Sequence, residues 1–168
     1  MTNKGKTIWF VGLPCSGKTT LAESIPKHPN TIHLDGDVLR KGINSDLRFS
    51  VKDRTENIRR TAHIAQMFNE HGNNVVASFI TPTHNIQDMV KDIVNDLYFV
   101  YVECSVEECI KRDVKGMYAK ALKGELPFFT GVGSPFQIPT KYSLKVNTES
   151  YTLEDSVDYL KVNIPRIK

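Results

Sequence analysis

The 168-residue chain has few of the features on which disulfide-rich and zinc-binding proteins depend. It contains only three cysteines, Cys15, Cys104 and Cys109, and none of them forms a CxxC pair. An odd number of scattered cysteines is typical of free thiols in a reducing compartment rather than of a disulfide framework. None of the five histidines lies in an HxH or HExxH pattern, so the sequence gives no indication of a zinc site.

Long apolar runs and strong charge are also missing. No stretch approaches the roughly 20 apolar residues of a membrane-spanning helix, and the apolar run near the N-terminus is too short for a signal peptide. We therefore expect a cytoplasmic protein that makes no contact with a membrane. The net charge of +3 suits an anionic small molecule but is too weak and too scattered to indicate nucleic-acid binding.

The sequence does contain a regular alternation of apolar runs and helical stretches. Strands are expected at Thr7–Val11, Thr31–Asp35, Asn74–Phe79, Leu97–Glu103 and Leu144–Asn147. Helices are expected at about residues 17–24, 36–42, 50–71, 86–94, 105–112 and 115–123, and after Thr152. This order predicts an α/β fold, in which a five-stranded parallel sheet carries helices on both faces within a single domain over residues 1–168.

The stretch "GLPCSGKTT" follows the first expected strand and begins the first expected helix. It fills every fixed position of the GxxxxGK[ST] phosphate-binding loop, or P-loop. In such a loop successive backbone N–H groups point at a phosphate, and the helix N-terminus adds its positive end. The motif assigns Lys18 to the β- and γ-phosphates of ATP and the Thr19 hydroxyl to Mg²⁺. The predicted ATP-binding residues are Gly12, Leu13, Pro14, Cys15, Ser16, Gly17, Lys18, Thr19 and Thr20.

Two carboxylates, Asp35 and Asp37, come at the end of the second expected strand. Because the carboxyl ends of parallel strands share one edge of a sheet, both should lie beside the P-loop. One would hold Mg²⁺ through water or accept the proton of an acceptor hydroxyl, and the other would orient nearby groups. With Lys18 they are the predicted catalytic residues. Capping of the short helix that follows is the alternative explanation for either aspartate.

Arg40, Arg54 and Asn57 follow in the next part of the chain. Arg54 and Asn57 are three residues apart on one expected helix and so share a face. Guanidinium groups bind phosphate or sulfate in a fork, so two arginines and an amide would suit an anionic acceptor. A solvated helix carrying a Glu56–Arg60 ion pair is the alternative explanation.

Phe49 and Phe129 lie in expected loops, where they would either stack on a flat ring or pack in the core. The chain has no clear guanine-reading NKxD motif and no DxxG stretch placed to act as a switch, so the residues indicate a small-molecule kinase. Two other functions stay open. One is a small P-loop kinase that acts on a sugar acid, a nucleoside or an antibiotic hydroxyl, and the other is a nucleotide-sensing module without turnover.

Several long blocks of the sequence resemble the adenylylsulfate kinase (APS kinase) family. They are "GLPCSGKTT", "LDGDVLRKGINSDLRFSVKDRTENIRR", "SFITP", "RDVKGMYAKALKGELPFFTG" and "LKVNT". The resemblance implies a P-loop kinase fold, usually in a homodimer. It also implies transfer of the γ-phosphoryl group of ATP to the 3′-hydroxyl of adenosine 5′-phosphosulfate (APS), which gives 3′-phosphoadenosine 5′-phosphosulfate and ADP.

The resemblance further implies roles for single residues. Asp35 and Asp37 match the aspartate pair of the family, with Asp35 favoured as the residue near Mg²⁺. The segment "FFTGVGSPFQIP" matches the mobile segment that closes over the substrates and excludes water. Acceptor contacts would come from Arg40, Phe49, Arg54, Asn57, Ile80 and Lys115, and from Phe129 stacking on the adenine.

Three stretches depart from the family pattern. Thr81 stands where the family usually has a serine that has been considered a phosphoryl carrier, and a threonine makes an obligatory phosphoserine impossible there. We therefore expect direct in-line transfer, with Thr81 at most orienting the substrate. His84 replaces a usual arginine, which removes a cationic contact or makes it dependent on pH. "GVGSPFQ" lacks the acidic residues that usually follow the FTG stretch.

Overall fold

The computed structural model describes residues 4–165, so the first and last three residues of the expected domain lie outside the described residues. Its strands form one five-stranded parallel sheet in the order β2-β3-β1-β4-β5. They are β1 Thr7–Val11, β2 Thr31–Asp35, β3 Asn74–Phe79, β4 Leu97–Glu103 and β5 Leu144–Asn147. The strand bounds and the parallel α/β fold are as the sequence predicts.

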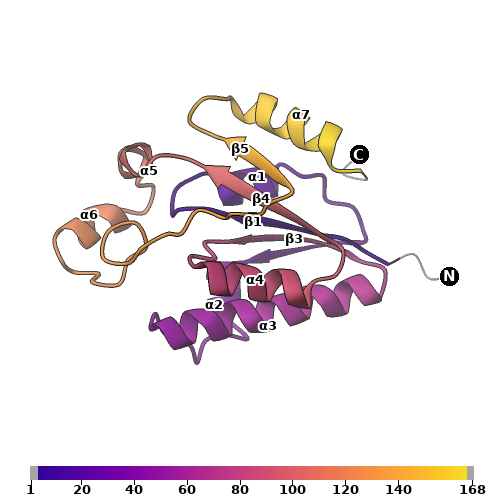
Figure 1. Cartoon of the computed structure of the whole chain (residues 1–168), viewed down its shortest axis with the longest axis horizontal. Helices are drawn as coiled ribbons and strands as arrows, with labels where there is room; N and C mark the ends of the chain where they lie inside the picture. The colour runs from indigo at the N-terminus through magenta and orange to yellow at the C-terminus, as the bar shows by residue number, and fades with distance from the viewer. Residues whose placement is uncertain (1–3, 166–168) are drawn as a thin grey trace.

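Helices cover both faces of the sheet (Figure 1). They are α1 Lys18–Glu23, α2 Gly36–Lys41, α3 Val51–Glu70, α4 His84–Ile93, α5 Val106–Arg112, α6 Met117–Leu122 and α7 Leu153–Asn163. In the figure α3 and α4 lie side by side on one face, and α1 and α7 lie on the other. Within residues 4–165, no helix is both long enough and apolar enough to cross a membrane.

The central strand β1 is buried along its whole length, and its side chains alternate between the two layers of core. Trp9 and Val11 pack in the cluster that includes residues of α3 and α4. Ile8 and Phe10 pack in the other cluster, with residues of α1 and α7. This alternation follows from the two-residue period of a strand, and a strand covered on both faces reads as the continuous apolar run "TIWFV".

The long helix α3 is fixed at its start by Ser50. The Ser50 hydroxyl accepts a hydrogen bond from the backbone N–H of Asp53 at 3.1 Å. In a capping box the Asp53 carboxylate would accept the backbone N–H of Ser50. Here it accepts the backbone N–H of Arg48 instead, at 3.1 Å. The first turn of α3 is therefore tied to the loop that precedes it.

Helix α4 begins at His84, two residues before the expected start at Ile86. Its N-cap residue Thr83 makes no side-chain capping bond. Gln137, far along the chain, instead supplies the acceptor, because its Oε1 receives the backbone N–H of His84 at 2.7 Å. A local sequence pattern cannot indicate a cap that another segment of the chain supplies.

We expect Ser50→Ala to lower the free energy of unfolding by about 1 kcal/mol, because the Asp53 N–H then loses its side-chain acceptor. Urea unfolding followed by circular dichroism measures the change. Ser45→Ala, at an exposed serine in the turn after α2, is the matched control and should unfold like the parent. Equal stabilities of the parent and the Ser50 variant would show that the cap contributes nothing.

Candidate active site

The carboxyl ends of the strands bring the predicted phosphate and acceptor residues to one edge of the sheet. Val11, the last residue of β1 before the P-loop, is in register with Phe79 at the end of β3. Asp35, the last residue of β2, is in register with Ser78. The segments that follow these strands therefore meet at the edge where parallel sheets bind their ligands.

The backbone of the P-loop requires glycine at two positions. A Cβ atom added to Gly12 would lie 2.6 Å from the backbone oxygen of Val102 and 2.8 Å from Oγ of Ser16. Gly17 has a φ of +96°, in the left-handed region that favours glycine, and Cys15 has a φ of +62°. Glycine is thus needed at Gly12 for space and at Gly17 for conformation.

Lys18 lies beneath this loop with only 8% of its surface exposed. Its ammonium group donates to the backbone oxygen of Leu13 at 2.5 Å and to the hydroxyl of Ser16 at 3.5 Å. Burial lowers the pKa of Lys18 to about 8, because removal from water disfavours the charged form. The loop therefore holds its cation at a defined position before any phosphate binds.

The two carboxylate oxygens of Asp35 make different contacts. Its Oδ1 caps α2 by accepting the N–H of Asp37 at 2.9 Å and that of Val38 at 3.3 Å. Its Oδ2 accepts from the hydroxyl of Ser78 at 3.2 Å and from that of Thr19 at 3.4 Å. Three oxygen atoms thus gather beside the P-loop, and oxygen is the ligand that Mg²⁺ prefers.

Asp37 forms an ion pair with Lys115, which lies between α5 and α6. The contact with Asp37 raises the pKa of Lys115. Both side chains are mostly exposed, so the pair contributes little to stability. Its consequence is positional, since it brings together two predicted site residues that are 78 positions apart.

The guanidinium group of Arg40 lies over the ring of Phe49, with its carbon atom 4.7 Å from the centre of the ring. Its Nη1 donates to the backbone oxygens of Arg48 at 3.0 Å and Leu47 at 3.4 Å. Phe49 keeps 59% of its surface exposed. The structure therefore brings together a cation and an accessible aromatic ring, both of which the sequence placed on the acceptor side.

Arg54 joins α3 to the segment that carries Phe129. Its Nε donates to the backbone oxygen of Phe49 at 2.9 Å, and its Nη1 donates to the hydroxyl of Thr130 at 2.7 Å. Its Nη2 donates to the backbone oxygen of Phe128. Sequence reasoning missed Thr130, which is buried and whose only signal is its place in the block "FFTG".

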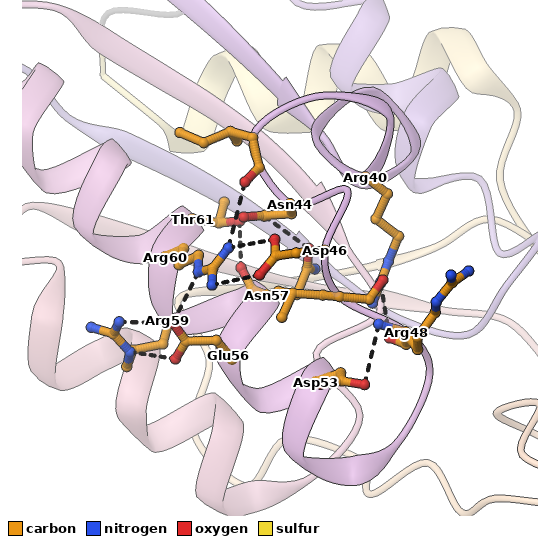
Figure 2. Close-up of polar contacts among 12 residues, drawn as sticks. Arg40, Asn44, Asp46, Arg48, Asp53, Glu56, Asn57, Arg59, Arg60 and Thr61 are labelled. Carbon is orange, nitrogen blue, oxygen red and sulfur yellow. Dashed lines mark hydrogen bonds and ion pairs between the residues drawn. The ribbon is translucent and has the colours of Figure 1, made fainter.

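Asn57 is almost fully buried, and its side chain bonds to the turn after α2 rather than to the residues that Arg54 contacts. Its Oδ1 accepts from Nδ2 of Asn44 at 2.9 Å (Figure 2). The Glu56–Arg60 ion pair of the alternative explanation is also present, at 2.9 Å. The helix nevertheless is not simply solvated here, because Arg54 and Asn57 both make specific contacts across the fold.

The hydroxyl of Thr81 faces the core. Thr81 is fully buried with a φ of +48°, and its Oγ1 accepts from the indole nitrogen of Trp9 at 2.9 Å. The neighbouring Ile80 is half-buried. That Thr81 orients the substrate stays a prediction. Because its hydroxyl is bonded to Trp9 in the core, such a contact would have to come from the backbone of Thr81.

Phe129 packs edge-on against Tyr118, with ring centres 4.9 Å apart and an angle of 80° between the rings. The hydroxyl of Tyr118 donates to the backbone oxygen of Pro14 at 3.1 Å. One side of the Phe129 ring therefore packs within the protein, as one of the two explanations from the sequence expected. Through Tyr118 this aromatic pair also connects the predicted mobile segment to the P-loop.

Sequence reasoning missed Thr148 and Arg112, which hold the P-loop from its other side. The hydroxyl of Thr148 donates to the backbone oxygen of Ser16 at 2.6 Å. Arg112 donates to the hydroxyl and the backbone oxygen of Thr148, at 3.1 Å and 2.7 Å. Their only sequence signal is membership of the blocks "RDVKG" and "LKVNT".

Comparison with known proteins gives a consistent result. The sequence profile of the adenylylsulphate kinase family matches residues 4–147. The adenylyl-sulfate kinase of Bacteroides thetaiotaomicron is 43% identical over 169 residues, which cover 96% of this chain and 84% of that protein. The adenylyl-sulfate kinase of Paraburkholderia xenovorans is 39% identical, with coverage of 96% and 93%.

The solved structures agree with the sequence comparisons. The APS kinase of Mycobacterium tuberculosis, in complex with AMPPNP and APS, matches with a TM-score of 0.88 and 33% identity, over 94% of this chain and 95% of that chain. A gluconokinase from Sinorhizobium meliloti matches with a TM-score of 0.65 over 97% and 93% of the two chains. Its identity is only 16%, so that likeness concerns the fold alone.

We expect Thr81→Val, which keeps the shape of the side chain, to lower the free energy of unfolding by about 1–3 kcal/mol. The reason is that the buried indole N–H of Trp9 loses its acceptor. In a Trp9→Phe background no donor remains, so the same change should have a much smaller effect. Urea unfolding of the four proteins measures this coupling, and additive effects would contradict it.

Proposed function

Because the chain belongs to the adenylyl-sulfate kinase family of ATP-dependent phosphotransferases, we propose how its residues move the γ-phosphoryl group of ATP to the 3′-hydroxyl of APS. One observation carries the proposal. The P-loop with its buried Lys18, the oxygen atoms around Asp35 and the Arg40–Phe49 pair meet at one edge of the sheet. The products are 3′-phosphoadenosine 5′-phosphosulfate and ADP.

On the donor side, the P-loop binds the phosphates of ATP and stabilises charge. Its backbone N–H groups and the ammonium of Lys18 neutralise the negative charge on the γ-phosphoryl group as it leaves ADP. Preorganisation supports this role, because the Lys18 ammonium is already fixed by Leu13 and Ser16. The predicted nucleotide contacts of all nine residues from Gly12 to Thr20 belong to this proposal.

The residues around Asp35 fit a bound Mg²⁺. Thr19, Asp35 and Ser78 offer only oxygen atoms, which are hard ligands of the kind that this ion takes. In the part of the chain described, residues 4–165, no cluster of three or more His, Cys, Asp or Glu side chains could hold a metal. Such a cluster is not required, since Mg²⁺ in kinases is held by one or two protein ligands, phosphates and waters. When bound, the ion neutralises phosphate charge.

The two aspartates then divide their roles. Both oxygens of Asp35 are occupied by the cap of α2 and by the hydroxyls of Thr19 and Ser78, which supports a place on the metal side. Asp37 pairs with Lys115, a predicted acceptor contact. We therefore assign Asp37 to the acceptor side, where its carboxylate takes the proton of the 3′-hydroxyl.

On the acceptor side, cations and aromatic rings recognise a flat anion. Arg40 supplies positive charge for the phosphosulfate group, and Lys115, held by Asp37, supplies N–H donors. Phe49 and Phe129 supply rings for the adenine. Arg54 stays a predicted acceptor contact, and its bonds to Phe128 and Thr130 support a second role in positioning the segment that carries Phe129. Closure of that segment over both substrates would exclude water.

The assembly and the location complete the proposal. We propose one domain over residues 1–168 that forms a homodimer, as the family resemblance implies, and light scattering on a sizing column tests the mass. A cytoplasmic location is supported by the free state of Cys15, Cys104 and Cys109, since a reducing compartment keeps thiols reduced.

One assay tests the function against its alternatives. Purified protein is incubated with ATP, Mg²⁺ and a panel containing APS, sugar acids and nucleosides, and the products are identified by mass. We expect product only from APS, and loss of turnover when a chelator removes the metal. Product from another acceptor but not from APS would favour a different small-molecule kinase. Nucleotide binding without any product would favour a sensing module.

We expect Lys18→Ala to lower kcat by roughly 100-fold or more, which is the scale of losing one preorganised charge contact to the transition state. Initial rates at saturating ATP and APS measure the effect. Lys161→Ala, on α7 and paired with Asp158, is the matched control and should keep parental turnover. Near-normal turnover of a folded Lys18 variant would contradict the proposed role.

A further inference from the structure

Two buried carboxamides meet between α2 and α3. Asn44, in the turn after α2, is fully buried, and Asn57 on α3 is 4% exposed. Nδ2 of Asn44 donates to Oδ1 of Asn57 at 2.9 Å (Figure 2). A carboxamide has one oxygen and one nitrogen at its end. An Asn57 oxygen that is held by Asn44 therefore leaves the NH₂ group of Asn57 directed away from Asn44.

The turn that carries Asn44 is fixed independently of this pair. The backbone N–H of Asn44 donates to Leu39 at 2.9 Å, and its backbone oxygen accepts the N–H of Leu47 at 3.1 Å. Arg60 of α3 forms a fork with Asp46 in the same turn, with bonds of 2.8 Å and 2.9 Å (Figure 2). The turn is thus attached to α3 even without the Asn44–Asn57 bond. The bond itself has a further consequence.

That consequence is the orientation of Asn57. On α3 it lies one turn after Arg54, whose Nε contacts Phe49, and Phe49 in turn contacts Arg40. Asn57 therefore belongs to the same helix and loop as the predicted acceptor contacts. Because its Oδ1 faces Asn44, the end of its side chain that faces away from Asn44 is the NH₂ group with its N–H donors.

Oδ1 of Asn44 is buried and has no hydrogen-bond partner among the described residues. The same holds for Oδ1 of Asn69 on α3, so an unpaired amide oxygen does not by itself mark a residue of the site. What sets Asn44 apart is its bond to Asn57, a predicted acceptor contact.

We propose that Asn44 is a positioning residue, which holds the oxygen of Asn57 so that the NH₂ group of Asn57 donates to the anionic acceptor nucleotide. The inference rests on the proposed function, because Asn57 is a predicted acceptor contact. The chemistry favours this orientation. Phosphate and sulfate oxygens accept N–H donors, and they would repel the carbonyl oxygen that a reversed amide would present.

Asn57→Asp tests the donor directly. The change keeps the size of the side chain and an oxygen that still accepts from Asn44, but it replaces the NH₂ group with a second oxygen. We expect a lower melting temperature, because the new carboxylate is almost fully buried. At a temperature where the variant is folded, we expect a KM for APS raised about tenfold or more and an unchanged KM for ATP. An unchanged KM for APS in the folded variant would overturn the proposal.

Asn44→Ala tests whether Asn44 acts through Asn57. We expect the KM for APS to rise about fivefold in the parent background, as a hydrogen bond that orients a ligand contact is lost. In an Asn57→Ala background the same change should have no further effect on KM. Equal effects of Asn44→Ala in the two backgrounds would show that it does not act through Asn57.

Asn69 provides a matched control on the same helix. It is 3% exposed, its Nδ2 donates to the hydroxyl of Thr7 at 2.7 Å, and its Oδ1 also has no partner among the described residues. Thr7 begins β1, at the sheet edge opposite the P-loop. Asn69→Ala should therefore lower the melting temperature and leave the KM for APS unchanged. A raised KM for APS there would show that lost stability alone explains the Asn44 result.

The parent enzyme separates this inference from the function on which it rests. If the parent makes no product from APS, the proposed function itself fails. If the parent makes product and the KM for APS responds to neither Asn57→Asp nor Asn44→Ala, only the positioning role fails. Should Asn44→Ala not fold, the Asn57→Asp result still decides, because that variant keeps the bond between the two side chains.

Discussion

The tight backbone of the P-loop is the constraint on which the rest of the structure depends. A loop whose N–H groups point outward to bind phosphate cannot satisfy those groups itself, so neighbouring elements must hold its shape. Pro14 is held by the hydroxyl of Tyr118, and Ser16 by the hydroxyl of Thr148. At Gly12 an added Cβ would lie 2.6 Å from the backbone of β4. The elements at the carboxyl edge of the sheet therefore hold the nine P-loop residues, Gly12 to Thr20, in position.

The two sides of the site are built differently, and Asp35 joins them. The proposed donor side comes from one short segment and the helix that follows it. The proposed acceptor side is assembled from α2, α3 and the turn between them, and from the segments before and after α6. Asp35 ends β2, caps α2 with one oxygen and contacts Thr19 and Ser78 with the other. A shift of α2 would thus move the acceptor side and the oxygen cluster beside the P-loop together.

This difference explains how much the sequence alone could predict. The strands and the P-loop follow from local patterns, because a buried parallel strand reads as an apolar run and the phosphate motif is contiguous. The start of α4 was missed because its cap comes from Gln137. Other contacts depend on residues more than 70 positions away. They are the bonds of Arg54 to Phe128 and Thr130, and the bond between the Thr81 hydroxyl and Trp9. No local pattern encodes such contacts.

The partners of the arginines offer a physical criterion for separating those that bind a ligand from those that stabilise the fold. Arg59 and Arg60 bond to carboxylates, which raise the pKa of both guanidinium groups and cancel their charge. Arg40 and Arg54 bond instead to neutral oxygens, and burial lowers their pKa. Neutral oxygens fix a guanidinium group in position without cancelling its charge. The positive charge of Arg40 and Arg54 on the proposed acceptor side therefore remains available to an anion, at positions that the fold has already set.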